Sequence, residues 1–158
     1  MASADETRPV GRVSVRAESF DLAAEMQALG GAGTGGVGGI GCFVGMVRGD
    51  GRLSALTLEH YPGMTERALA RIAEAAIRRF DLLGCTVIHR IGRLPVGAPI
   101  VLVLAAAAHR GAALDATAFL IDWLKTQAPF WKREEFADGS QSWVETRAAD
   151  DAAAARWS

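Results

Sequence analysis

The sequence predicts an α+β fold, because segments with helical and with strand-like apolar spacing follow one another in mixed order. Half of the 158 residues are hydrophobic, which is enough to bury the core of one compact domain over residues 1–158. The 17 Lys and Arg residues are balanced by 18 Asp and Glu residues. This balance excludes an overall basic field for nucleic acid or an anionic membrane, so any anion site must be local.

The N-terminal third is predicted to form strands around a glycine-rich break. Val13 and Val15 alternate as in a first strand, and residues 22–29 have the spacing of a short helix. Residues 37–47 alternate with a period of two, and a Gly-Asp-Gly turn separates them from the strand-like residues 53–61. These two segments are predicted to pair with each other as a β-hairpin.

The rest of the chain is predicted to contain two longer helices and four strands. Apolar side chains recur at helical spacing in residues 65–80, and residues 111–126 form an Ala- and Leu-rich helix that must end before Pro129. The strands are expected at 84–90, 100–108, 130–136 and 141–145. The first two strands are almost wholly apolar and should be buried in one sheet, whereas an Ala-Asp-Gly-Ser turn predicts that the last two form a hairpin.

The glycine-rich stretch 31–41 contains the loose pattern G-x-G-x-x-G twice. It follows a helix and enters a strand, whereas the dinucleotide-binding motif follows a strand and enters a helix. The sequence also contains neither a phosphate-binding P-loop nor a G-x-S-x-G serine elbow. We therefore assign no cofactor to this chain.

Cysteine and histidine are sparse and scattered. Cys42 and Cys85 form no C-x-x-C pair, which argues against a disulfide framework and a cysteine metal site. His60, His89 and His109 lie at no ligand spacing from either cysteine, and structural roles are expected for the first two. The sequence therefore predicts no metal site. Because the N-terminus also lacks the features of a secretory signal, the sequence predicts a cytoplasmic protein.

Basic side chains concentrate toward the C-terminus. His109 and Arg110 open the long helix, where free N–H groups and the helix dipole favour an anion such as phosphate; a surface ion pair is the alternative. Lys125, near the end of that helix, is either a partner of the helix dipole or a functional group. Lys132 shares a strand face with aromatic rings, which would desolvate its amine for acid, base or nucleophilic chemistry. The alternative for Lys132 is an ordinary edge-strand lysine paired with a neighbouring glutamate.

Helix length separates the two ends of this cationic cluster. Arg110 and Lys125 are fifteen residues apart, which corresponds to about 22 Å along a straight helix. One small ligand does not bridge that distance. If both ends serve one site, a two-fold dimer solves the problem, because His109 and Arg110 of one subunit would then face Lys125 and Lys132 of the other.

Several segments closely resemble the large, catalytic subunit of molybdopterin synthase, in the order in which that family has them. They are Leu56–Met64, Val87–Gly92, Ala108–Arg110, Asp122–Thr126, Ala128–Glu134 and Trp143–Glu145. The resemblance covers about residues 37–147, and the terminal Ala155–Trp157 is also similar. Residues 1–10 and 150–158, outside the main match, are expected to be flexible or to be ordered by a partner.

The resemblance implies an α/β-hammerhead-like domain with an additional antiparallel β-sheet subdomain. It also implies a homodimer that binds two small ubiquitin-like sulfur-carrier subunits, which makes a heterotetramer. The carrier's Gly-Gly tail would deliver sulfur from a C-terminal thiocarboxylate to cyclic pyranopterin monophosphate, forming the dithiolene of molybdopterin for the molybdenum cofactor. Two carriers would be consumed for each product, so the sulfur comes from the partner and not from a cysteine of this chain.

The resemblance further implies roles for individual residues. Lys125 and Lys132 match the catalytic lysines, and a transient amide between Lys125 and the carrier's C-terminus is left as an open alternative. His109 and Arg110 match a pair that binds the substrate phosphate from the opposite subunit. The other matching positions are the substrate-binding residues Met46, Val47, Arg48, Arg133, Glu134 and Arg147, and the pocket residues Phe43 and Ile121.

This chain departs from the family pattern in two places. The turn Gly49–Arg52 is shorter than the loop that the family usually has there, and Ile121 replaces a common Met. Neither departure removes a charged group. The alternative function is a non-catalytic homologue that binds the carrier tail or the pterin without transferring sulfur, and the presence of both lysines and of the phosphate-binding cations favours the enzyme.

Overall fold

The computed structural model describes residues 9–31, 35–144 and 148–158, which form two four-stranded sheets and four helices. The first sheet has the strand order β1-β4-β6-β2, and the second sheet has the order β5-β3-β7-β8. The strands are β1 (Val10–Arg16), β2 (Gly39–Met46), β3 (Leu53–His60), β4 (Gly84–Arg90), β5 (Gly92–Pro95), β6 (Pro99–Ala107), β7 (Phe130–Phe136) and β8 (Gln141–Val144). The helices are α1 (Leu22–Gly31), α2 (Met64–Phe80), α3 (Arg110–Gln127) and α4 (Ala148–Ala155). The predicted α+β class is confirmed.

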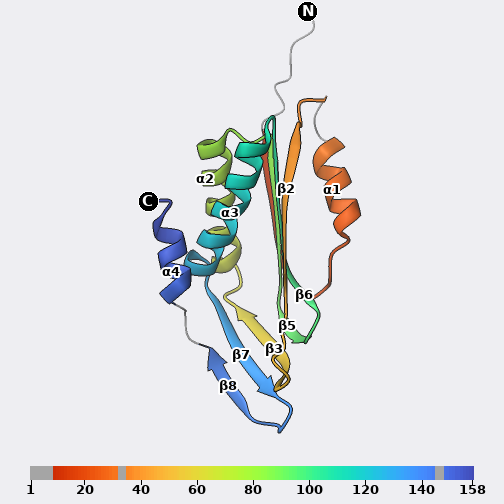
Figure 1. The fold of residues 1–158 in the computed structure, drawn as a ribbon, viewed down its shortest axis with the longest axis vertical. Coiled ribbons are helices and arrows are strands. Elements are labelled where there is room, and N and C mark those ends of the chain that lie inside the picture. The colour runs from red at the N-terminus through yellow and green to blue at the C-terminus, as the bar shows by residue number, and fades with distance from the viewer. Residues whose placement is uncertain (1–8, 32–34, 145–147) are drawn as a thin grey trace, which may run out of the picture.

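The first sheet is covered on both faces. Helices α2 and α3 lie on one face and α1 lies on the other (Figure 1). Strand β1 runs parallel to β4, whereas β4 and β2 both run antiparallel to β6. The prediction that residues 84–90 and 100–108 are buried in one sheet is therefore confirmed, and burial on both faces explains their continuous apolar sequence.

The second sheet extends from one end of the first (Figure 1). Its strands β7 and β8 form the predicted hairpin. The predicted pairing of residues 37–47 with 53–61 is wrong, because β2 pairs with β6 while β3 pairs with β5 and β7. The backbone of Val47 exchanges hydrogen bonds with Gly97 and Ala98, at 2.8 and 2.9 Å. The chain thus stays bound to the loop before β6 as it leaves the first sheet, and the turn that follows carries it into the second.

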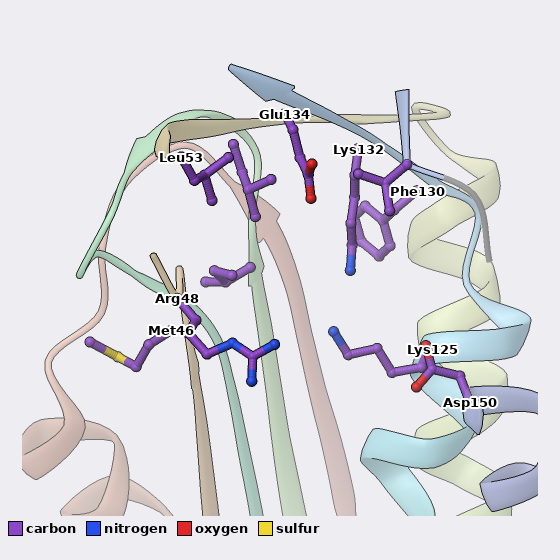
Figure 2. Close-up of a pocket in the computed structure, with 11 residues that line it drawn as sticks. Met46, Arg48, Leu53, Lys125, Phe130, Lys132, Glu134 and Asp150 are labelled. Atoms are coloured by element: carbon purple, nitrogen blue, oxygen red, sulfur yellow. The ribbon is translucent and has the colours of Figure 1, made fainter. Parts of the chain in front are cut away.

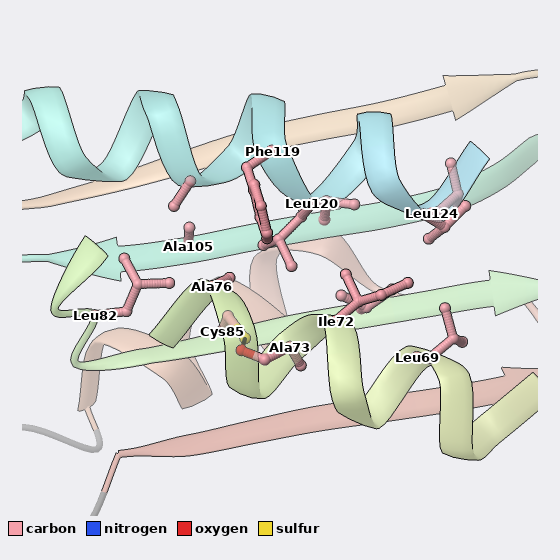
Figure 3. Close-up of a cluster of buried hydrophobic side chains, with 14 of the residues drawn as sticks. Leu69, Ile72, Ala73, Ala76, Leu82, Cys85, Ala105, Phe119, Leu120 and Leu124 are labelled. Atoms are coloured by element: carbon pink, nitrogen blue, oxygen red, sulfur yellow. Dashed lines mark hydrogen bonds between the residues drawn. The ribbon is translucent and has the colours of Figure 1, made fainter. Parts of the chain in front are cut away.

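The main hydrophobic core lies beneath α2 and α3 and continues through both sheets. Phe119 and Leu69, from the two helices, are about 1% exposed, and Leu58 and Leu94 extend the same cluster into the second sheet (Figure 3). Burying each such side chain contributes about 1.5–3 kcal/mol to the free energy of unfolding. A smaller cluster on the opposite face of the first sheet, beneath α1, includes Leu102 and Leu104.

Helix α3 lies unusually close to β2 at Gly41. A Cβ atom on Gly41 would be 2.2 Å from Thr117 Oγ1 and 2.4 Å from the carbonyl oxygen of Ala113. Only a residue without a side chain fits there, so Gly41 determines how closely α3 packs on the sheet. The position of α3 in turn determines where Lys125, in its last turn, extends.

The C-terminal residues pack back on α3. The indole Nε1 of Trp157 and the guanidinium of Arg156 both donate to Asp122 Oδ2, at 2.8 Å. The Trp157 ring also makes edge contacts with Phe80 and Phe119, with ring centroids 5.8 Å apart. These contacts accompany the packing of α4 beside α3 (Figure 1).

Candidate active site

A cavity of about 300 Å³ lies between residues at the end of the first sheet, residues of the second sheet and the C-terminal end of α3. Its lining residues come from both sheets, from α3 and from α4. They are Met46, Arg48, Leu53, Leu56, Ile100, Lys125, Phe130, Lys132, Glu134, Val144 and Asp150. We call this cavity the cationic pocket.

Three basic side chains from different parts of the fold converge in the cationic pocket. Arg48 follows β2, Lys125 lies in the last turn of α3 and Lys132 lies on β7. Figure 2 shows their charged ends extending into the same cavity from different sides. Such a concentration of positive charge, in a chain with a net charge of −1, makes a local site for an anion.

The alternation of β7 decides which of its side chains reach the pocket. Phe130, Lys132 and Glu134 share the face that lines it, as the strand periodicity predicts. Arg133 lies on the opposite face, with its guanidinium carbon 5.8 Å from the centre of the Trp143 ring. In this single chain Arg133 therefore does not line the cavity.

Acidic and apolar groups complete the lining. Glu134 and Asp150 add two carboxylates to the lining that contains the three cations. Leu56, Ile100 and Phe130 contribute an apolar side. Several lining residues are not among those predicted from the sequence, namely Leu53, Leu56, Ile100, Phe130, Val144 and Asp150. Phe130 could have been found from its alternation with Lys132, but no local pattern indicates that α4 brings Asp150 to the pocket.

Three of the other sequence-predicted residues lie near the pocket without lining it. Val47 is buried, at 2% exposure, between the pocket residues Met46 and Arg48. Ile121 packs against the main core one turn before Lys125. Phe43 lies on β2, the edge strand of the first sheet, and is partly exposed.

His109 and Arg110 lie at the opposite end of α3 from Lys125, and both are exposed. His109 is the extended residue that precedes the helix, and Arg110 is its first residue. Neither lines the cationic pocket of its own chain. Arg147, the remaining predicted site residue, lies outside the residues that the structure describes.

Neither cysteine of the chain lines the cationic pocket. Burial in the core raises the pKa of the Cys85 thiol to about 12, and burial also raises the pKa of Cys42. Both changes disfavour the nucleophilic thiolate. Within residues 9–31, 35–144 and 148–158, no group of three His, Cys, Asp or Glu side chains could hold a metal ion. None of the helices described here combines the length and the apolar character needed to cross a membrane.

Comparison with known proteins gives consistent results. Residues 15–127 match the family described as "MoaE protein". Catalytic subunits of molybdopterin synthase from Rhizobium meliloti and Pseudomonas aeruginosa are 52% and 51% identical to this chain. Each alignment covers 92% of this chain, with 94% of the Rhizobium and 97% of the Pseudomonas protein.

Solved structures agree with the sequence comparison. The molybdopterin biosynthesis MoaE protein from Burkholderia ambifaria superimposes with a TM-score of 0.81 at 46% identity, over 93% of this chain and 97% of that protein. The fold is also shared, at 20% identity and a TM-score of 0.70, with a protein of Helicobacter pylori. That alignment covers 87% of this chain and 91% of the Helicobacter chain, which was solved in a complex of subunits 1 and 2 of molybdopterin-converting factor. The resemblance found in the sequence is thus confirmed, and this chain belongs to the MoaE protein family.

Proposed function

We propose that this chain is the catalytic subunit of a molybdopterin synthase. It transfers sulfur from the C-terminal thiocarboxylate of a small ubiquitin-like carrier to cyclic pyranopterin monophosphate. The observation that carries the proposal is the convergence of Arg48, Lys125 and Lys132 in one small cavity whose lining contains no cysteine. Membership of the MoaE family supports the same function.

The chemistry of the pocket suits two anionic reactants. A substrate phosphate is bound by the Arg48 guanidinium, which donates hydrogen bonds to its oxygens. The thiocarboxylate sulfur attacks the substrate, and Lys125 and Lys132 stabilise the negative charge and protonate the departing oxygen. For each sulfur, one C–S bond forms on the substrate and the carrier's C–S bond is hydrolysed, so the carrier leaves as a carboxylate. Two carriers supply the dithiolene.

The size of the cavity fits a tail that ends in Gly-Gly. A volume of about 300 Å³ leaves little room beside a pterin ring, and glycine residues need no space for side chains. The apolar side chains of Leu56, Ile100 and Phe130 in the lining offer a surface for the pterin ring, and Phe130 lies beside Lys132 (Figure 2). The small carrier is thus the proposed partner, and its tail is the proposed sulfur donor.

We also propose that the enzyme is a homodimer that pairs through β2. This strand is at the edge of the first sheet, and it contains neither a charged residue nor a proline over its eight residues. Such an edge offers free backbone N–H and C=O groups to another strand. Phe43, Met46 and Leu114 are exposed hydrophobic side chains on β2 and on the first half of α3, and a second copy would bury them.

Antiparallel pairing of β2 with its two-fold mate would complete the cationic pocket. In such a pair the start of one strand lies beside the end of the other. The start of β2 is close to Arg110, whose Cα would be 3.8 Å from a Cβ on Gly39, and its end leads directly into Arg48. The partner's His109 and Arg110 would therefore come near Arg48, and the two ends of α3 would serve one site.

Mixed dimers test the enzyme and the shared site together. Lys125→Ala and Arg110→Ala variants are prepared separately. Molybdopterin is measured as the fluorescence of its oxidised form after addition of thiocarboxylated carrier and of substrate at a concentration far below KM, where a raised KM also leaves Arg110→Ala nearly inactive. The two variants are then unfolded together and refolded as a mixture. If residues from two chains form one site, about one quarter of the sites recover both wild-type residues and activity returns to that level. If each site is built from one chain, the mixture stays as inactive as its components.

Further experiments test the enzyme and the dimer separately. Absence of product with the wild-type protein and both substrates would favour the non-catalytic binding module. Cys42 lies on β2 and is exposed, so a short bis-maleimide should link two chains through it and give a covalent dimer. A monomer in sedimentation at micromolar concentration, with full activity, would refute the dimer.

We place the reaction in the cytoplasm, because Cys42 and Cys85 are both free thiols, as in a reducing compartment.

A further inference from the structure

His89 is a buried titratable group immediately behind the wall of the cationic pocket. It lies near the end of β4, on the same strand face as Cys85 and Val87, and it is only 2% exposed. Its imidazole stacks on the ring of Phe130, with ring centroids 3.8 Å apart and an angle of 19° between the planes. Phe130 is itself a lining residue of the pocket, two residues before Lys132 on the same face of β7.

A hydrogen bond orients the imidazole. Nδ1 of His89 lies 2.8 Å from the carbonyl oxygen of Arg90. Because a carbonyl only accepts, Nδ1 carries the proton in this contact and Nε2 is unprotonated in the neutral ring. The ring is therefore held at one edge by the backbone of β4 and across one face by Phe130.

The charge state of His89 is coupled to the pocket. Burial, together with the positive charges of Lys125 and Lys132, lowers the pKa of His89 to about 3, against the opposing effect of the hydrogen bond to the Arg90 carbonyl. The imidazole is thus neutral at any working pH, and no fourth positive charge is added to the three cations of the pocket. A neutral ring is also the form that stacks on Phe130 without a desolvation cost.

We propose that His89 is a positioning residue for sulfur transfer, which holds the Phe130 ring as a fixed wall and thereby aligns the start of β7 with Lys132. Phe130 is the first residue of β7, and it follows the end of α3 by only three residues. Its ring therefore lies where the chain passes from Lys125 to Lys132. A wall free to rotate at this point would change the approach of the two amines to a bound ligand. The proposal rests on the proposed function only for the reaction in which the alignment is used.

Two substitutions separate the stacking ring from simple core filling. His89→Leu fills the site but removes the stack, and His89→Phe restores a ring that can stack on Phe130. Val87→Ala, on the same strand face but outside the pocket lining, is the matched control for a loss of core stability. Each variant is measured for thermal unfolding and for kcat and KM of sulfur transfer. A small amine-reactive acylating reagent is then used to compare the rates at which Lys125 and Lys132 are acylated, and the products are measured by peptide mass spectrometry.

We expect His89→Leu to lower kcat about tenfold while KM stays within about twofold, because misplacement of reacting groups acts mainly on kcat. His89→Phe should recover most of this loss. The ratio of Lys132 to Lys125 acylation should change in His89→Leu and stay at the wild-type value in Val87→Ala. Because His89 is proposed to act through Phe130, the double variant His89→Leu with Phe130→Leu should lose no more than Phe130→Leu alone.

The opposite results overturn the proposal. They are losses that follow the melting temperature alike in His89→Leu and Val87→Ala, effects of His89→Leu and Phe130→Leu that simply add, or an unchanged acylation ratio. The acylation measurement needs neither carrier nor pterin, so it decides the role of His89 even if the wild-type protein makes no molybdopterin. If the wild-type protein fails to transfer sulfur but His89→Leu changes the acylation ratio, the proposed function is rejected and the role of His89 in placing the lysines is kept.

Discussion

The two ends of helix α3 carry basic residues in contrasting surroundings. At the C-terminal end, Lys125 lines a cavity together with Arg48, Lys132 and two carboxylates. At the N-terminal end, Arg110 is exposed, and the nearby sheet edge has no neighbouring strand among the described residues. One end thus lines a cavity, and the other end carries exposed basic side chains next to a strand that is unpaired among the described residues.

This difference is what the proposed dimer would explain, because one rigid helix would then serve two sites at once. Gly41 lets the first half of α3 pack tightly against β2. Because α3 is one continuous helix of 18 residues, its two ends cannot approach each other within one chain. In the proposed dimer, a second copy related by a two-fold axis at β2 would bring opposite ends together without bending the helix. The contrast leads to predictions that differ in size for the two ends.

The largest effect is expected from the lysines at the pocket end. Lys125→Ala and Lys132→Ala should each lower kcat by about 10²–10⁴, because positioned proton donors contribute rate factors of that order. Carrier affinity should change by less than about threefold, as measured by titration calorimetry. Arg110→Ala, at the other end, should instead raise KM for the phosphorylated substrate. Arg78→Ala, a change at an exposed α2 side chain, serves as the control, and equal kinetics in all variants would remove the distinction between the ends.

The next effect concerns how α3 is held. Gly41→Ala should lower the free energy of unfolding by about 1–3 kcal/mol, because its methyl group would overlap Thr117 and Ala113. Gly111→Ala, in the first turn of the same helix, meets nothing within 4 Å and should raise the stability by about 0.5–1 kcal/mol. Denaturation in urea measures both. Equal stabilities would mean that α3 is not held at Gly41.

A third effect follows from the imidazole behind the pocket. The pKa of His89 is about 3 in the folded protein and about 6.5 in an unfolded chain. Between these values the unfolded chain binds one more proton, so the free energy of unfolding should fall by about 1.4 kcal/mol for each unit by which the pH decreases. Above pH 6.5 this group adds no pH dependence. The acid slope should be smaller in His89→Phe, and identical slopes from pH 6.5 to 4 would contradict the buried neutral state.

The smallest effect is expected at the mouth of the pocket. Asp150→Asn removes a negative charge from the lining of the cationic pocket and should tighten binding of the anionic carrier tail by about two- to fivefold, the size typical of a partly screened charge pair. Asp151→Asn changes the next residue of α4, which does not line the cationic pocket, and should leave the affinity unchanged. Fluorescence titration with a labelled tail peptide compares the two, and an equal gain in both would show that only net charge matters.

Much of the fold could be predicted because it depends on local periodicity. The alternation in residues 130–136, and the apolar runs that became β4 and β6, identified these strands correctly. The predicted hairpin of residues 37–47 and 53–61 failed because its short glycine turn was compatible with pairing but did not require it. Pairing was decided by partners far along the chain, since β6 binds β2 and β7 binds β3.

The candidate site divides in the same way. Arg48, Lys125, Lys132 and Glu134 were identified from the sequence, and they line one cavity in the structure. Asp150 was not identified, because tertiary contacts bring α4 to the pocket, among them those of Trp157 and Arg156 with Asp122. His89 was expected to have a structural role, and its stacking on Phe130 became visible only when β4 and β7 were placed together.

By itself the sequence determined the α+β class, the charges available for a local anion site and the family to which the chain belongs. The tertiary structure alone decided which strands pair, which cations share a cavity and which remain at the far end of α3. The physical reason is that secondary structure and charge depend on residues close together in the chain. Pairing and convergence depend on the packing of segments that are tens of residues apart, as Lys125 and Arg48 are in this pocket.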